Sequence, residues 1–297
     1  MGYKVILTLL EGPHDAAFIS RILKENGFTT TKKIIKDLPS PLNLYLSNPK
    51  SFQSALVEDM KIGTVQQSFF PKEVLEKGDN TVVLFSTGGV TKTEVRNKII
   101  TQFNAVKVAE NSGEANNEKG LSISVLFLLD AEEEGLAIRL AAIAKEISDA
   151  MNVELAAATI TNGGFVKIDD IDFGAFVFTK PATEKGRLED VLLPLMQQAN
   201  EPVFEDATTF LSKINSYALF TGKTNNADVK QITKVDKQDF NFEKSLISTA
   251  GQLQTSGKSN VQVIRESSYL TKDKILANDQ CKLIAKFFED TLIKVQA

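Results

Sequence analysis

The chain alternates short, nearly continuous apolar runs with longer segments in which apolar residues recur at helical spacing. The apolar runs occupy residues 3–10, 81–85 and 121–129. Such runs predict strands that are buried on both faces, as in a parallel sheet. Two further runs predict strands at residues 154–161 and 171–179.

Helices are predicted between these strands, because apolar residues there recur three and four positions apart. The predicted helices cover residues 15–26, 92–103, 135–151 and 187–199, and the polar residues 104–120 predict a loop. Strands and helices in alternation predict an α/β fold with a mostly parallel sheet and helices on both of its faces.

The end of the chain has a different pattern. From residue 196 onward it is mainly helical or irregular, with polar loops predicted at residues 221–228 and 255–260. We therefore predict an α/β domain over residues 1–195 and a helical extension packed on it over residues 196–297. No element is assigned to residues 29–74.

Composition narrows the class of protein. With 42% hydrophobic and 24% charged residues, the chain is typical of a soluble globular protein. Apolar runs are too short for a signal peptide or a transmembrane helix, so we expect a cytoplasmic protein with no membrane association. A net charge of −4 argues against a surface that binds nucleic acid all over. The single histidine and single cysteine exclude zinc sites rich in these residues.

Carboxylates follow two of the buried runs directly. Glu11 ends the first, with Asp15 shortly after it, and Asp130 ends the third, followed by three glutamates at 132–134. Ligands of open parallel sheets bind beyond the carboxyl ends of the strands. If the two strands are neighbours, their carboxylates converge, and such clusters select hard cations, chiefly Mg²⁺ or Mn²⁺. The alternative is that these acids only cap the helices that follow, which would suit Asp15 and Glu134.

The sequences of both segments resemble the motifs of the TOPRIM family, whose fold is shared by primases, topoisomerases and the overcoming-lysogenization-defect nucleases. The first family motif is a buried strand ending in Glu-Gly with an acid a few residues on, and residues 6–15 read ILTLLEGPHD. The second is a buried strand ending in Asp-x-Asp, and residues 127–135 read FLLDAEEEG. Glu132 stands where the family usually has its second Asp. The resemblance implies metal ligation by Glu11, Asp15, Asp130 and Glu132.

Two later segments resemble a small bacterial branch of TOPRIM-like proteins related to those nucleases. Residues 186–193 read GRLEDVLL, and residues 242–247 read FEKSLI. By this resemblance Glu189, or alternatively Asp190, supplies a further metal ligand, and Lys244 supplies a catalytic lysine. Three basic residues near Glu189 could hold substrate phosphates or only line a solvated loop; they are Lys180, Lys185 and Arg187.

The sequence therefore favours an Mg²⁺- or Mn²⁺-dependent nuclease, with Glu11 as metal ligand or general base. A non-catalytic TOPRIM-like module that binds nucleic acid, a nucleotide or a partner protein is the alternative. An ATPase partner, as some relatives have, would supply any ATP-driven step. Primase-like nucleotidyl transfer ranks last, because no zinc-binding segment accompanies the motifs.

Overall fold

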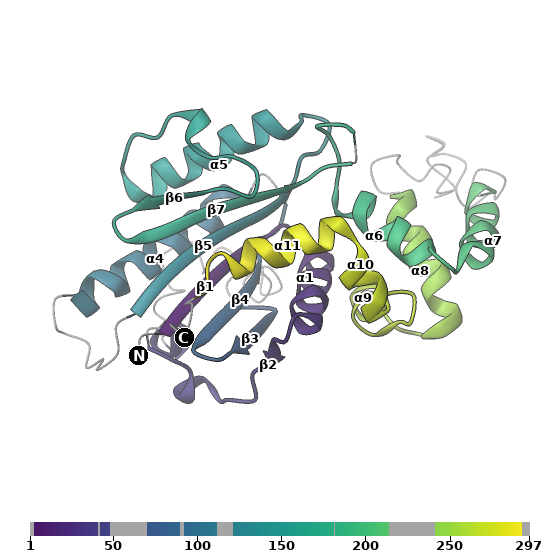
Figure 1. Ribbon diagram of the computed structural model, residues 1–297, viewed down its shortest axis with the longest axis horizontal. Helices are drawn as coiled ribbons and strands as arrows, with labels where there is room; N and C mark the ends of the chain where they lie inside the picture. Colours follow the sequence, from purple (N-terminus) through teal and green to yellow (C-terminus); the bar gives the residue numbers. More distant parts are fainter. Residues whose placement is uncertain are drawn as a thin grey trace, which may run out of the picture.

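One mixed sheet organises the protein (Figure 1). The computed structural model describes residues 3–40, 42–47, 70–89, 92–111, 121–180, 182–213 and 241–292. Within these residues the sheet has seven strands in the order β2-β3-β4-β1-β5-β7-β6. Their bounds are β1 Tyr3–Leu10, β2 Thr29–Thr30, β3 Glu73–Lys77, β4 Asn80–Ser86, β5 Leu121–Asp130, β6 Phe165–Ile168 and β7 Ile171–Phe178. The central four, β4-β1-β5-β7, are parallel, and the outer strands pair antiparallel.

Helices connect and follow the strands. Those before residue 160 are α1 Pro13–Glu25, α2 Leu42–Ser47, α4 Thr93–Asn111 and α5 Leu136–Met151, with short 3₁₀ turns η1 Ile35–Asp37 and η3 Ala157–Thr159. Later ones are α6 Leu188–Gln197, α7 Glu201–Ser212, α8 Phe242–Gln254, α9 Asn260–Glu266, α10 Lys272–Ala277 and α11 Asp279–Glu289. None of the described helices is long and apolar enough to cross a bilayer.

Two apolar cores cover the two faces of the sheet. Along β1, Ile6 and Leu10 point into the core formed with α1 and the C-terminal helices, whereas Leu7 and Leu9 point into the core with α2, α4 and α5. This alternation is the period of two expected of a strand buried on both sides. Figure 1 shows α1 and α11 lying along the first of these faces.

The helix arrangement places a topological switch point between β1 and β5. From β1 the chain passes through α1 on one face, adds β2 and β3 at the edge of the sheet, and then forms β4 beside β1. From β4 it crosses by α4 on the opposite face to β5. The parallel strands thus follow the doubly wound order second-first-third-fourth, in which ligands bind where the direction of winding reverses. Glu11 and Asp130 lie at that point.

The structure confirms the α/β class, the largely parallel sheet and the helical C-terminal region. The predicted strand at 154–161 is wrong: residues 157–159 form the 3₁₀ turn η3 at the surface, and only Ile160 of residues 154–160 is buried. The position beside β7 belongs instead to β6, which the sequence analysis missed. Both β6 and β3 are short antiparallel strands with charged residues, a composition typical of the outer part of a sheet.

Two loop predictions and the domain boundary also bear on the fold. Helix α4 continues to Asn111, so the loop predicted from residue 104 begins too early; helix-forming residues carry α4 to the turn signal. Residues 112–120 and the predicted loop at 221–228 lie outside the described residues. The core on the α1 face contains residues from both sides of position 195, and the predicted boundary itself stays a prediction.

Candidate metal centre at the carboxyl edge of the sheet

Three carboxylates converge where the parallel strands end. Glu11, Asp130 and Glu132 each offer an oxygen, and these oxygens lie within 4.8 Å of one another. Main-chain donors fix two of them, since Asp130 N–H donates to Glu11 Oε1 at 3.0 Å and Leu188 N–H donates to Asp130 Oδ1 at 2.8 Å. The predicted convergence of Glu11 and Asp130 on adjacent parallel strands is confirmed.

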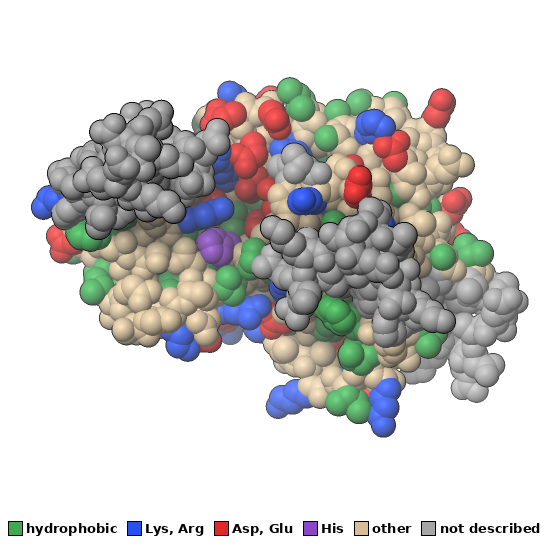
Figure 2. All heavy atoms as spheres, turned by 180° about the vertical axis from the view of Figure 1, so that it is seen from behind, with side chains coloured by type: hydrophobic (Ala, Val, Ile, Leu, Met, Phe, Trp, Pro, Cys, Tyr) green, Lys and Arg blue, Asp and Glu red, His purple; other side chains and the backbone are tan. Residues whose placement is uncertain are grey.

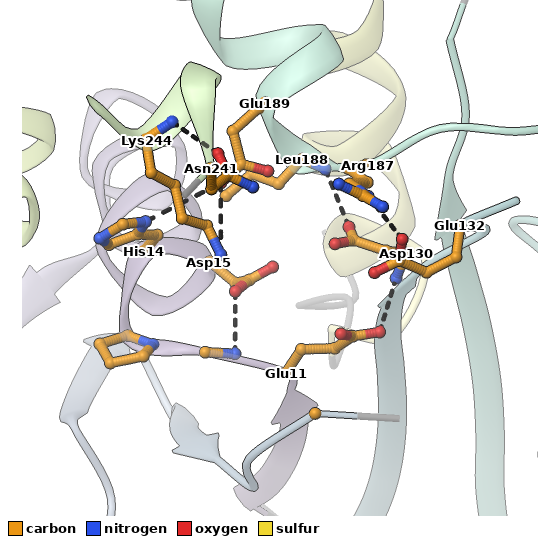
Figure 3. Close-up of a pocket in the computed structure, with 13 residues that line it drawn as sticks. Glu11, His14, Asp15, Asp130, Glu132, Arg187, Leu188, Glu189, Asn241 and Lys244 are labelled. Carbon is orange, nitrogen blue, oxygen red and sulfur yellow. Dashed lines mark hydrogen bonds and ion pairs between the residues drawn. The ribbon is translucent and has the colours of Figure 1, made fainter. Parts of the chain in front are cut away.

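Asp15 approaches the same cluster from the first turn of α1. Its Oδ2 accepts the Gly12 N–H at 2.9 Å, so the carboxylate caps the helix as the alternative interpretation allowed. Its Oδ1, however, has no hydrogen-bond partner among the described residues, although the residue is only 5% exposed. Figure 3 shows this second oxygen turned toward the cavity between Asp130 and Glu11. A buried oxygen without a donor is costly, and a cation would satisfy it.

Burial and mutual repulsion disfavour the charged forms of these acids. The pKa of Asp130 is raised to about 9, first by desolvation and then by the charges of Asp15 and Glu11. The pKa of Asp15 is raised to about 7 by desolvation and by Glu11, and burial also raises the pKa of Glu11. Crowded carboxylates of this kind take up protons unless a cation neutralises them.

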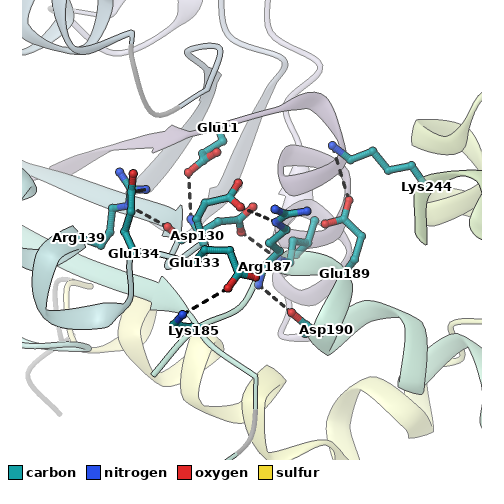
Figure 4. Close-up of polar contacts among 12 residues, drawn as sticks. Glu11, Asp130, Glu133, Glu134, Arg139, Lys185, Arg187, Glu189, Asp190 and Lys244 are labelled. Carbon is teal, nitrogen blue, oxygen red and sulfur yellow. Dashed lines mark hydrogen bonds and ion pairs between the residues drawn. The ribbon is translucent and has the colours of Figure 1, made fainter. Parts of the chain in front are cut away.

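Glu189 faces the cluster from the start of α6, and Asp190 does not. The Glu189 Oε1 lies 3.8 Å from Lys244 Nζ and 3.9 Å from His14 Nδ1. Burial raises the pKa of Glu189, but the contacts with His14 and Lys244 outweigh burial and lower it. Asp190 instead accepts the Arg187 N–H at 2.9 Å, as a helix cap (Figure 4). The sequence left these two acids as alternatives, and the structure selects Glu189 for this cleft.

The basic residues singled out from the sequence are largely paired. Arg187 Nε donates to Glu132 Oε2 at 2.5 Å, and Lys185 Nζ lies 3.4 Å from Glu133 Oε2. Lys180 lines a neighbouring cleft, together with both of these residues. Their predicted role as phosphate ligands is not tested by this geometry and stays a prediction.

The carboxylates line an open cleft of about 350 Å³. Its lining includes Glu11, Asp15, Asp130, Glu132, Arg187, Glu189 and Lys244. The neighbouring cleft, of about 310 Å³, shares Glu132, Arg187 and Glu189 with it. Figure 2 looks onto this side of the molecule and shows red carboxylates gathered beside the purple histidine, with blue basic side chains around them.

Two buried arginines support the site and were not found from the sequence. Arg139 of α5 donates from Nε to the Asp130 carbonyl oxygen at 2.8 Å, and its charge lowers the pKa of Glu11. Arg96 of α4 makes a buried double contact with Glu146 and donates to the Gly89 carbonyl oxygen at 3.1 Å. An arginine in an amphipathic helix gives no signal that it will be buried, because burial depends on neighbouring helices.

A glycine turn follows β4 and contacts the backbone of Glu11. Gly88 and Gly89 have φ of 81° and 54°, conformations that favour glycine. Their N–H groups donate to the Glu11 carbonyl oxygen at 2.9 and 3.3 Å. The turn therefore fixes the backbone of Glu11, and these two donors are already engaged.

Comparisons with known proteins give one family and one solved structure. No curated protein matches the chain. The fold is similar to that in the crystal structure of hypothetical protein PH0156 from Pyrococcus horikoshii OT3, at 16% identity, over 97% of this chain and 95% of that one, with a TM-score of 0.49. A family model described as "Protein of unknown function (DUF3226)" matches residues 5–289. The chain therefore belongs to this family.

Proposed function

We propose that this protein is a divalent-cation-dependent nuclease whose cation is Mg²⁺ or Mn²⁺. The observation that carries the proposal is the convergence of Glu11, Asp130 and Glu132, whose oxygens lie within 4.8 Å of one another. The buried Oδ1 of Asp15 beside them, which has no hydrogen-bond donor among the described residues, is an independent acceptor that a cation would satisfy. An all-oxygen donor set of this kind suits Mg²⁺ or Mn²⁺.

The resemblance to TOPRIM proteins supports the same conclusion. Its two motifs supply these acids, and the segment resembling the nuclease-related branch supplies Glu189. Glu132 departs from the family's Asp, and its backbone has a left-handed φ of 52°. An unusual conformation in a residue without glycine's freedom is frequent at functional sites. In this conformation an oxygen of the longer Glu132 side chain lies within 4.8 Å of an oxygen of each of the other two carboxylates.

The residues of the cleft have distinct roles in this proposal. When bound, the cation would polarise the phosphodiester and lower the pKa of a bound water. Glu11, Asp130 and Glu132 would hold it, with Asp15 and Glu189 as further ligands. Alternatively, Glu11 would act as the general base that accepts a proton from the attacking water. Lys244, beside Glu189, would stabilise negative charge that develops on the phosphate.

Cleavage assays on the full chain test the proposal. Single-stranded and duplex DNA and RNA are incubated at low salt with Mn²⁺, with Mg²⁺ or with EDTA, because weak nucleic-acid binding fades with salt. We expect cleavage with the metals and none with EDTA. Glu11→Gln and Asp130→Asn should abolish it, whereas Glu133→Gln, a change in an exposed neighbour, should retain it. Equal cleavage by wild type and Asp130→Asn would identify a contaminating nuclease and remove the support for the proposal.

The pairing of the basic residues favours a second candidate function. Arg187 and Lys185 are held by Glu132 and Glu133, and the chain carries a net charge of −4. A non-catalytic module would bind a cation here and rely on a partner protein, such as an ATPase, for nucleic-acid affinity. Clear Mn²⁺ binding without cleavage of any of the four substrates would support this candidate.

A further inference from the structure

Glu132 takes part in two contacts that compete. Its carboxylate belongs to the cluster that would hold the cation, and its Oε2 accepts the Arg187 Nε–H at 2.5 Å. Figure 3 shows the Arg187 side chain directed at Glu132 next to Asp130. A guanidinium at this position satisfies one of the carboxylates and repels a second positive charge. The Arg187–Glu132 pair therefore opposes cation binding at Glu132.

The backbone holds Arg187 in place whether or not this ion pair is formed. Glu132 N–H donates to the Gly186 carbonyl oxygen at 2.8 Å, and Gly186 N–H donates to the Glu132 carbonyl oxygen at 3.3 Å. The Arg187 N–H is fixed by Asp190 at 2.9 Å. Opening the side-chain pair would thus move only the guanidinium. The Arg187 side chain is 42% exposed and lines both clefts, so it can turn within them.

We propose that Arg187 is a substrate-phosphate ligand whose guanidinium stays paired with Glu132 until the cation binds. This inference rests on the proposed cation site. When Glu132 exchanges the guanidinium for the cation, Arg187 is released beside the carboxylate cluster, where a phosphodiester would lie. A guanidinium matches two phosphate oxygens with two parallel N–H donors. Phosphate affinity would then depend on the cation, so that the cleft binds its anionic substrate only when the cation is bound.

Lys185 offers a matched control on the same loop. It is also paired with a glutamate, but Glu133 lies outside the carboxylate cluster and its side chain is 85% exposed (Figure 4). Lys185→Gln and Arg187→Gln remove the same charge from neighbouring positions. Only the second removes a competitor for a proposed metal ligand.

The test is calorimetric titration of full-length variants with Mn²⁺ alone, and with inorganic phosphate in the presence and absence of Mg²⁺. We expect Arg187→Gln to bind Mn²⁺ about twofold to fivefold more tightly than Lys185→Gln, the range that partly exposed ion pairs imply. Wild type should bind phosphate only with Mg²⁺, and Arg187→Gln should weaken that binding about tenfold or more. Arg187→Lys keeps the charge without the planar guanidinium. Its Mn²⁺ affinity and its phosphate affinity should both lie between those of wild type and Arg187→Gln.

The outcomes separate this inference from the proposed function. If wild type and Asp130→Asn bind Mn²⁺ equally, the proposed cation site is wrong and the role of Arg187 falls with it. If Asp130→Asn loses Mn²⁺ binding but Arg187→Gln and Lys185→Gln have equal Mn²⁺ affinity, the site stands and the exchange is wrong. Phosphate binding to wild type that is independent of Mg²⁺ would also overturn the exchange. Circular dichroism of each variant confirms that the comparison is made between folded proteins.

Discussion

Asp130→Asn should stabilise the metal-free protein and should remove most of the stabilisation that metal gives to wild type. In the folded, metal-free protein the pKa of Asp130 is about 9, whereas in the unfolded chain it lies near the ordinary 3.8. At pH 7 the unfolded chain gains free energy by ionising this acid, and the folded protein does not. The difference of about 3 pKa units between 3.8 and pH 7 corresponds to about 4 kcal/mol of lost stability at pH 7.

Asparagine removes this penalty and keeps the contact that Asp130 makes. Its Oδ1 can still accept the Leu188 N–H, now seen at 2.8 Å. The folded protein can relax around a charged Asp130, which makes the penalty smaller than the full value of about 4 kcal/mol. We therefore expect Asp130→Asn to raise the free energy of unfolding by about 2–4 kcal/mol, or Tm by roughly 5–10 °C. Metal should favour wild type over the variant. Mn²⁺ at 100 times its Kd should stabilise wild type by about 2.7 kcal/mol and the variant hardly at all.

Thermal unfolding monitored by circular dichroism, with EDTA and with Mn²⁺, measures both effects. Glu133→Gln is the control, since this neighbouring side chain is 85% exposed and lies outside the cluster. It should leave both the metal-free Tm and the Mn²⁺ increment close to those of wild type. A lower metal-free Tm for Asp130→Asn, together with an unchanged Mn²⁺ increment, would refute the electrostatic reasoning and the assignment of Asp130 as a ligand.

Three further predictions follow from the same geometry. The metal-free protein should lose stability as pH rises from about 4 to about 9, because the folded pKa values of Asp15 and Asp130 are raised to about 7 and 9; urea unfolding in EDTA across this range checks the sign, and stability that rises instead would contradict it. Gly186→Ala should lower the free energy of unfolding by about 1–3 kcal/mol or more, since φ is 143° and the added Cβ would lie 2.3 Å from a backbone nitrogen. Gly78→Ala, where φ is 59° and the added Cβ would meet open space, should lower it less in the same urea titration. Lys244→Ala should slow cleavage at least tenfold with Mn²⁺ affinity retained, because Lys244 would act on the transition state; equal loss of metal binding in calorimetry would argue against that role.

The local pattern of the chain was enough to predict the central architecture. The apolar runs at β1, β4, β5 and β7 are buried on both faces, so each run had to be a strand inside a parallel sheet. The acids directly after two of those runs could then be placed at one edge, since parallel strands all end at the same edge. The outer strands β3 and β6 escaped prediction because they are short, only partly buried and of mixed polarity, so that each segment resembles a loop.

What only the tertiary structure decided is the set of contacts between segments far apart in the sequence. Glu189 and Asp190 are adjacent acids in the first turn of one helix, and the resemblance put Glu189 first with Asp190 as the alternative. The packing of α6 places Glu189 beside Lys244 and leaves Asp190 as the helix cap. The pairing of Arg187 with Glu132 depends likewise on the backbone bridge between Gly186 and Glu132. Sequence patterns report which face of an element is apolar, whereas side-chain partners across a cleft depend on how elements dock, and that is set by the packed core as a whole.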